Sequence, residues 1–167
     1  MAGFGLNIER AEAFANDQGL VLDTLTVTVS ERRGGAELDE AERKQAARSL
    51  RRVIAGKEDV QELLSRRSLS FGARGRLPIE PEVTFDNATS SRATIFHVAA
   101  QDRTGLLYDL SSAFSRNSCD IEVLLIETQG RRAIDAFYVV GPNGKLSDAE
   151  CAHLVEELRG ACKYKAA

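Results

Sequence analysis

The chain carries one structural pattern twice, and this repeat constrains the fold more than any other feature of the sequence. Each copy has an Asn/Asp-Ile-Glu triplet, then a turn at a glycine, then a strand of alternating residues that begins with aspartate. In the first copy these are residues 7–9, residue 19 and residues 23–27. In the second copy they are residues 120–122, residue 130 and residues 135–139. Such self-similarity indicates one fold unit used twice. The second copy has an additional strand and helix in front, residues 93–118, whereas little precedes Leu6. We therefore expect the first copy to lack its first strand and helix, so that the chain begins within a domain.

Composition narrows the class of protein. The 167 residues suffice for one domain or two small ones, and 43% are hydrophobic. The net charge of −3 argues against binding to nucleic acid, for which a basic face is typical. No apolar run has the length of a bilayer span and no signal peptide precedes the first strand, so we expect a cytoplasmic protein without a membrane partner. The three cysteines and two histidines lack the spacing of a metal site, and we expect no metal and no cofactor.

The sequence of the first copy predicts a β-hairpin followed by helices. Alternation and turn residues predict strands over Leu6–Asn16 and Leu20–Ser30. Asp39, with Glu42 three residues later, predicts a capping box at the start of a helix that ends near Gly56. The apolar stripe expected on this helix consists of Ala46, Ala47, Leu50, Val53 and Ile54. A second, short helix is expected over Asp59–Ser65.

A basic segment separates the two copies. Residues 65–78 hold four arginines and no acidic residue, which is typical of a solvated linker and, as the less favoured alternative, of an anion-binding arm. The short strand that follows, Glu82–Phe85, contains no proline but is preceded by Pro81, which places it at a sheet edge. We assign this strand to the first copy as its last strand, so that the first, partial domain covers residues 1–87.

The second copy, residues 92–163, is complete or nearly so. The pattern predicts strand, helix, strand, strand and helix in this order, with the last helix capped by Ser147 and Glu150. Each helix has a single apolar stripe, so both should cover one face of an antiparallel sheet. The expected fold class is α+β, ferredoxin-like (βαββαβ), with a partial second unit.

A strand that ends in Asp102-Arg103-Thr104-Gly105-Leu106-Leu107 and runs into a helix resembles the ACT domain, a regulatory module of amino-acid metabolism. The longer segment around this motif resembles the C-terminal tandem ACT region of bacterial protein-PII uridylyltransferase/uridylyl-removing enzymes. It includes Phe85-Asp86-Asn87 before the motif and Asp135-Ala136-Phe137-Tyr138-Val139 after it. The first copy, from Gly5 to Thr24, is similar to the penultimate ACT domain of these enzymes. Thr104 departs from the family, which usually has proline there.

The turn at residues 102–107 is the candidate binding site. Gly105 lets a ligand approach the backbone, and the amides of Gly105, Leu106 and Leu107 are expected to be unpaired at a helix N-terminus, where they can receive a carboxylate. Asp102 either accepts from an ammonium group or caps the helix. The resemblance implies an amino acid, glutamine, held by Asp102, Arg103, Thr104, Gly105, Leu106 and Leu107 against a strand of a neighbouring unit. That strand would carry Asn7, Ile8 and Glu9, or Asp120, Ile121 and Glu122.

Catalytic residues are not predicted, because no nucleophile motif, phosphate loop or carboxylate cluster is present. The resemblance implies a glutamine-sensing regulatory region whose longer parent is a nucleotidyltransferase, with an active site upstream and the PII protein as partner only through that parent. One alternative is an interaction or oligomerisation module without a ligand. Another is an RNA-binding sheet that uses Phe96, Phe137 and Tyr138, which the acidity opposes.

The remaining polar residues have simpler interpretations. Asp23 and Asp135 occupy matching strand positions, and a salt bridge or a solvent-facing position is favoured for both over ligand binding. The strand Leu20–Ser30 would have an open edge if the first strand of its copy is absent. A second copy of the chain could cover this edge, so we expect a homodimer or a higher oligomer.

Overall fold

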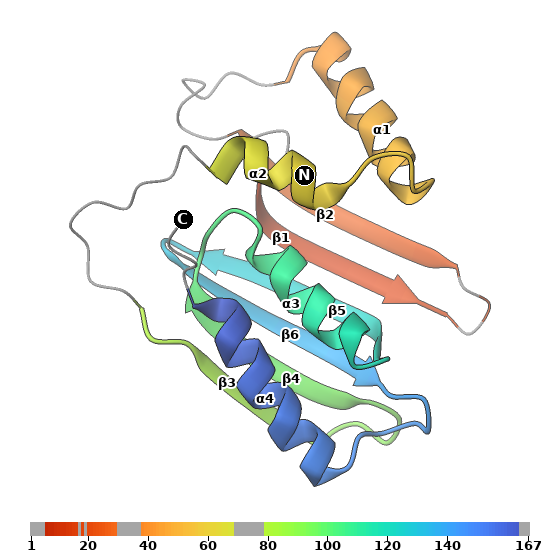
Figure 1. Ribbon diagram of the computed structural model, residues 1–167, viewed down its shortest axis with the longest axis vertical. Coiled ribbons are helices and arrows are strands. Elements are labelled where there is room, and N and C mark those ends of the chain that lie inside the picture. Colours follow the sequence, from red (N-terminus) through yellow and green to blue (C-terminus); the bar gives the residue numbers. More distant parts are fainter. Residues whose placement is uncertain (1–5, 17, 19, 30–37, 69–78, 164–167) are drawn as a thin grey trace. The chain divides into compact units, whose positions relative to one another are not determined.

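The computed structural model describes residues 6–16, 18, 20–29, 38–68 and 79–163 of the chain. Backbone contacts divide it into two compact units, Met1–Ile8 with Val27–Arg76 and Glu9–Thr26 with Leu77–Ala167. The elements in chain order are β1 (Leu6–Ala15), β2 (Val21–Val29), α1 (Glu40–Ile54), α2 (Val60–Ser68), β3 (Glu82–Asp86), β4 (Thr94–Gln101), α3 (Leu106–Arg116), β5 (Asp120–Gln129), β6 (Arg132–Val140) and α4 (Asp148–Cys162). The chain is therefore α+β, as predicted (Figure 1). No helix in the described ranges is long and apolar enough to cross a membrane.

The first unit contains both helices of the first copy. The Asp39–Glu42 capping box at the start of α1 is present, and Gly56 has a φ of +66° just after the helix ends, as a helix terminus requires. The predicted apolar stripe of α1 is not buried, since Ile54 is 78% exposed and no α1 residue is buried. Helix α2 continues to Ser68, so the predicted linker does not begin at Ser65; residues 69–78 lie outside the described part.

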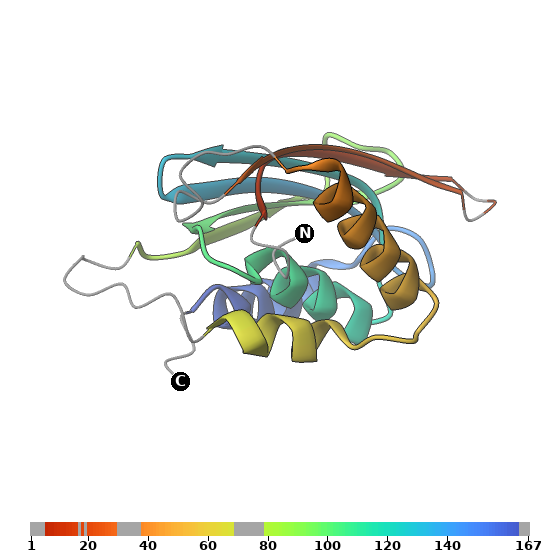
Figure 2. The ribbon, with the colours of Figure 1, turned by 90° about the horizontal axis from the view of Figure 1, so that it is seen from above.

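The second unit holds a six-stranded sheet in the order β2-β1-β5-β6-β4-β3. Strand β1 pairs with β5, β3 with β4, β4 with β6 and β5 with β6, each pair antiparallel. Helices α3 and α4 cover one face of strands β3 to β6, as Figure 2 shows in green and blue. The predicted order of strand, helix, strand, strand and helix over residues 94–162 is confirmed.

The prediction that the strand over Val83–Phe85 is the last strand of the first copy is wrong. This strand forms β3, and β3 pairs antiparallel with β4, so that Val83 opposes Val98 and Phe85 opposes Phe96. Val83 is buried under α4. The outer strand of the second copy thus precedes β4 instead of following α4. The physical reason is that β4 needs a partner on its outer edge, and any antiparallel strand with apolar residues on the helix-facing side can supply it.

The core of the second unit lies between the sheet and the two helices. Phe114 of α3 packs between Phe96 of β4 and Phe137 of β6, with ring centroids 5.3 and 5.0 Å apart, and all three rings are fully buried. This burial contradicts the RNA-binding alternative, which needed Phe96 and Phe137 exposed on the sheet. The aromatic cluster fixes α3 on the sheet, and with it the turn from which α3 starts.

Candidate functional site

The turn between β4 and α3 depends on one glycine. Gly105 occupies the N-cap position of α3 with φ 82° and ψ 1°, a left-handed conformation that side-chain-bearing residues rarely adopt. No side chain caps the helix there, so Asp102 does not have the capping role considered above. The N-terminus of α3 therefore has no side-chain hydrogen bond to its first amides.

Two of the three amides predicted to be unpaired are so. The amides of Gly105 and Leu107 have no hydrogen-bond acceptor within the part of the chain that the structure describes. The Leu106 amide, in contrast, donates to the Arg103 carbonyl at 3.1 Å, and the Leu106 side chain is buried. The prediction that the Leu106 amide is unpaired is wrong, because the chain folds back by a tight turn before the helix begins.

Asp102 lies at the base of this turn. Its amide donates to the Arg131 carbonyl at 2.8 Å, which fastens the end of β4 to the β5–β6 turn. Its carboxyl group is half-buried, and burial raises its pKa, partly countered by the hydrogen bond from the Arg103 amide. An ammonium group brought to this carboxylate would be held in a partly desolvated place, where charge attraction is stronger than in water.

The burial of Asp135 on β6 differs more from the sequence prediction than any other feature at this end of the sheet. Asp135 faces the helices, it is 3% exposed, and its Oδ1 atom has no hydrogen-bond partner. Burial, with a smaller contribution from the Asp102 charge, raises its pKa to about 7. Neither the salt bridge nor the solvent-facing position predicted for Asp135 is observed, whereas Asp23 is exposed. A carboxyl group with this pKa changes charge in the neutral range.

Arg103 holds the turn against both helices. Its Nη2 atom donates to Asp109 Oδ2 on α3 and to the Ala161 carbonyl on α4, each at 2.6 Å. The side chain is 15% exposed, and its Nε atom is buried without an acceptor. Its Nη1 atom donates to the Thr104 carbonyl at 3.4 Å. Arg103 therefore supports the turn through three hydrogen bonds.

The two sets of strand residues predicted near the turn lie at different places. Glu9 precedes Arg10, which pairs with Glu127 on β5. The Gln129 end of β5 lies at the same end of the sheet as the end of β4 that leads into the turn, with β6 between the two strands. The other set begins at the opposite end of β5, where Asp120 opposes Val140. Glu122 there accepts from Arg92 at 2.8 Å. Within this chain Asp120, Ile121 and Glu122 are thus separated from the turn by the length of the strand, about 30 Å for ten residues.

Asn7 and Ile8 belong to a different compact unit from Glu9, although all three residues are part of strand β1. Asn7 and Ile8 belong to the first unit and Glu9 to the second. The side chain of Asn7 lies outside the described part of the chain. Their contact with a ligand therefore stays a prediction.

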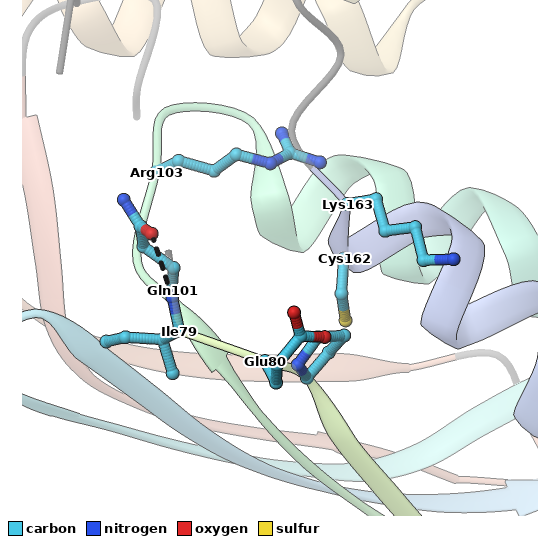
Figure 3. A pocket seen from close by; sticks show the side chains of 7 residues that line it. Ile79, Glu80, Gln101, Arg103, Cys162 and Lys163 are labelled. Carbon is cyan, nitrogen blue, oxygen red and sulfur yellow. Dashed lines mark hydrogen bonds between the residues drawn. The ribbon is translucent and has the colours of Figure 1, made fainter. Parts of the chain in front are cut away.

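A pocket of about 180 Å³ adjoins the turn on the side of β3 and α4. Figure 3 shows Arg103, Gln101 and Cys162 around it, with Glu80 on the side opposite Arg103. Burial raises the pKa of the Cys162 thiol to about 11, so the thiol is neutral near pH 7 and is a poor nucleophile. No local pattern in the sequence predicts this pocket, because its walls come from three distant segments.

The described residues contain no group of three or more histidine, cysteine or acidic side chains arranged to hold a metal ion. The three cysteines, Cys119, Cys151 and Cys162, are all buried free thiols.

Comparisons with known proteins identify relatives of this chain. The chain is 37% identical over 141 residues to the bifunctional uridylyltransferase/uridylyl-removing enzyme of Bradyrhizobium diazoefficiens, and 35% identical over 144 residues to that of Rhodopseudomonas palustris. Each match covers 83% of this chain but only 14% and 15% of these two relatives. No family model and no solved structure matches. The chain is homologous to a region of the bifunctional uridylyltransferase/uridylyl-removing enzymes.

Proposed function

We propose that the chain is an amino-acid-sensing regulatory region of ACT type, that its ligand is glutamine, and that it belongs to a cytoplasmic protein of the PII uridylyltransferase kind. The similarity to the bifunctional enzymes supports the kind of protein. The observation that carries the sensing role is the turn at Gly105, with two free amides beside the Asp102 carboxyl group. An anion-binding and a cation-binding group then lie within one short segment, as a zwitterionic ligand requires.

The proposed binding mode divides the turn residues by task. The amides of Gly105 and Leu107 receive the ligand carboxylate, which the N-terminus of α3 also attracts through its dipole. Asp102 accepts from the ligand ammonium group, and Thr104 borders the ligand between these groups. Arg103 and Leu106 hold the turn in shape through the contacts described above. The strand Asn7-Ile8-Glu9 or Asp120-Ile121-Glu122 would cover the ligand from outside when a neighbouring copy of the chain supplies it.

Regulation by such a site requires two arrangements of the protein. A ligand shifts the balance between them only by binding one more tightly than the other. In a parent enzyme, glutamine would in this way shift the balance between uridylylation and deuridylylation of the PII protein. We assign no catalytic residue to this chain, and PII is a partner only of the longer protein.

Calorimetric titration tests the sensing role directly. We expect L-glutamine to bind and Asp102→Asn to weaken its binding about 10- to 100-fold, because a hydrogen bond to a charged group contributes about 1.5–3 kcal/mol. Asp23→Asn is the matched control, since Asp23 is the exposed aspartate on β2. Absence of heat with every amino acid of a panel, or equal affinity of the Asp102 and Asp23 variants, would contradict the proposed function.

A second candidate function is self-association through the sheet edge. Strand β2 is one of the two edge strands of the sheet, and it exposes Val21, Leu22 and Leu25, with Leu22 67% exposed. An unprotected apolar edge strand is a template for pairing with another chain. We expect light scattering to report a dimer, and Leu22→Lys to convert it to monomer, because a charge on an edge strand opposes strand pairing. A wild-type monomer at high concentration would remove this candidate.

A further inference from the structure

Asp135 is a buried carboxyl group without a partner. Its side chain is 3% exposed, its Oδ1 atom accepts no hydrogen bond, and no ion pair holds it within the part of the chain that the structure describes. An ionised carboxylate in such surroundings is strongly disfavoured, so the group keeps a proton instead. Its burial therefore explains why its pKa is raised to about 7.

Asp135 and Asp102 lie in phase on the same face of the sheet, with alanines between them in the two strands concerned. Asp135 on β6 opposes Val98 on β4, and Ala133 opposes Ala100 one step closer to the turn. Asp102 comes two residues after Ala100, and alternate residues of a strand share a face. Both alanines are buried. No bulky side chain of β4 or β6 therefore separates the two carboxyl groups on this face.

The elements packed around Asp135 bring few other charges to it. From β5 it is opposed by Ile126, and the buried side of α3 carries no ionisable residue. From α4 the nearby titratable group is the Cys162 thiol, which is neutral at pH 7 because its pKa is raised to about 11. Arg103 is held in an ion pair with α3. Among the described residues, Asp102 is thus the charge that acts on Asp135, and it raises the pKa of Asp135 beyond the effect of burial.

The charge at Asp102 influences how firmly Asp135 holds its proton. The stretch of β4 and turn from Val98 to Asp102 spans about 13 Å. Two unit charges at about this distance, with an effective dielectric constant of about 20, change each other's pKa by about one pH unit. A cation placed on Asp102 therefore lowers the pKa of Asp135 by up to about this amount.

We propose that Asp135 couples glutamine binding at the turn to the release of a proton. The ammonium group of the ligand neutralises Asp102, the O–H bond of the Asp135 carboxyl group breaks, and the proton passes to a buffer base. Asp135 does not touch the ligand, so its part is electrostatic. This proposal concerns the regulation of the proposed glutamine site and rests on the proposed function.

The sign of the pH dependence follows from this coupling. Because the complex holds fewer protons than the free protein, glutamine should bind more tightly as pH rises. Asp135 contributes up to about a tenfold rise in affinity between about pH 5 and 8, with about half a proton released per glutamine near pH 6.5. Asp135→Asn should lack this contribution, because asparagine does not ionise.

Calorimetric titration of the full chain with L-glutamine at about pH 6.5 tests the coupling. The two buffers are PIPES, which has a small heat of ionisation, and imidazole, which has a large one. A released proton adds the ionisation heat of the buffer, so we expect the wild-type heats to differ by about half of the difference between the buffers. Asp135→Asn should give equal heats in both buffers. Asp23→Asn, which removes an exposed aspartate at the matching place of the repeat, should behave as the wild type.

A measurement without ligand tests the same pair of carboxyl groups. The ¹³C resonance of the Asp135 carboxyl group, assigned from its loss in Asp135→Asn, should titrate with a midpoint near pH 7. In Asp102→Asn this midpoint should be lower by up to about one pH unit. Bound glutamine with equal wild-type heats in the two buffers, or a midpoint that Asp102→Asn does not move, overturns the coupling and leaves the proposed function standing. Absence of glutamine binding overturns both, so the two failures are distinguishable.

Discussion

Replacing Asp135 with asparagine is expected to stabilise the protein at pH 8 by up to about 4 kcal/mol and to leave its stability near pH 4 unchanged. In the folded state the pKa of Asp135 is raised from 3.8 to about 7, chiefly by burial. The unfolded chain ionises this group near pH 4, so the native state binds more protons than the unfolded state between pH 4 and 7. Stability must then fall as pH rises through this window, by about 1.4 kcal/mol per unit.

The sign follows from which state prefers the proton. The stabilisation of the native state by the protonated carboxyl is complete below the unfolded pKa and is lost as pH approaches about 7. We assign the proton to Asp135 and not to Asp102 because Asp135 is the more deeply buried of the two. Asparagine has the shape of the protonated side chain without its ability to ionise, so the variant should not lose stability over this range.

Urea unfolding of both proteins between pH 4 and 8 measures this difference. Subtracting the wild-type curve from the variant curve removes the contribution of all other titrating groups. Asp23→Asn, an exposed aspartate at the matching place of the repeat, should follow the wild type at every pH. A wild-type stability that does not fall, relative to Asp135→Asn, from pH 5 to 7.5 would show that Asp135 is not buried as described.

Truncating Phe114 to alanine is expected to destabilise the protein by about 3–5 kcal/mol, the usual effect of removing a fully buried aromatic ring. The ring is the centre of the cluster with Phe96 and Phe137 and is inaccessible to solvent. Its loss leaves a cavity under α3 and removes two aromatic contacts. Thermal unfolding followed by circular dichroism should show a midpoint lower by roughly 2–4 °C per kcal/mol for a chain of this size.

Phe85 provides the matched comparison for Phe114. It contacts the same cluster through Phe96, with centroids 6.3 Å apart, but it lies on the edge strand β3 and is 37% exposed. Phe85→Ala should therefore cost much less than Phe114→Ala. Equal losses would mean that α3 is not anchored on the sheet through Phe114, and the rigidity that we ascribe to the turn would lose its basis.

Local patterns in the sequence were sufficient for most helix and strand positions. The capping boxes at Asp39 and Ser147 were identified from spacing alone, because both partners of such a box lie three residues apart. The strands from Thr94 to Val140 were found from their alternation. The same alternation places Asp135 in phase with Ala133, Phe137 and Val139, all of which are buried, and so indicates that Asp135 is buried too.

The pairing of distant segments could not be predicted from such local patterns. The sequence showed that Val83–Phe85 is a strand, but its partner β4 was decided by which edge needed covering. The amides of the turn show the same limit: Gly105 was correctly singled out, while the bond from Leu106 to the Arg103 carbonyl depends on the fold of the turn. The two contacts of Arg103 with Asp109 and Ala161 join three segments that nothing local connects.

The sequence by itself determined the repeat, the kinds and order of the elements in the second copy, and the glycine on which the turn depends, because periodicity, capping and backbone conformation act over a few residues. The tertiary structure alone decided the partner of β3, the burial of Asp135 and the pocket beside Arg103. These three depend on free energies that arise only when separate segments meet: the pairing of an open strand edge, the removal of water from a carboxyl group, and the closing of a space between a strand end and a helix end.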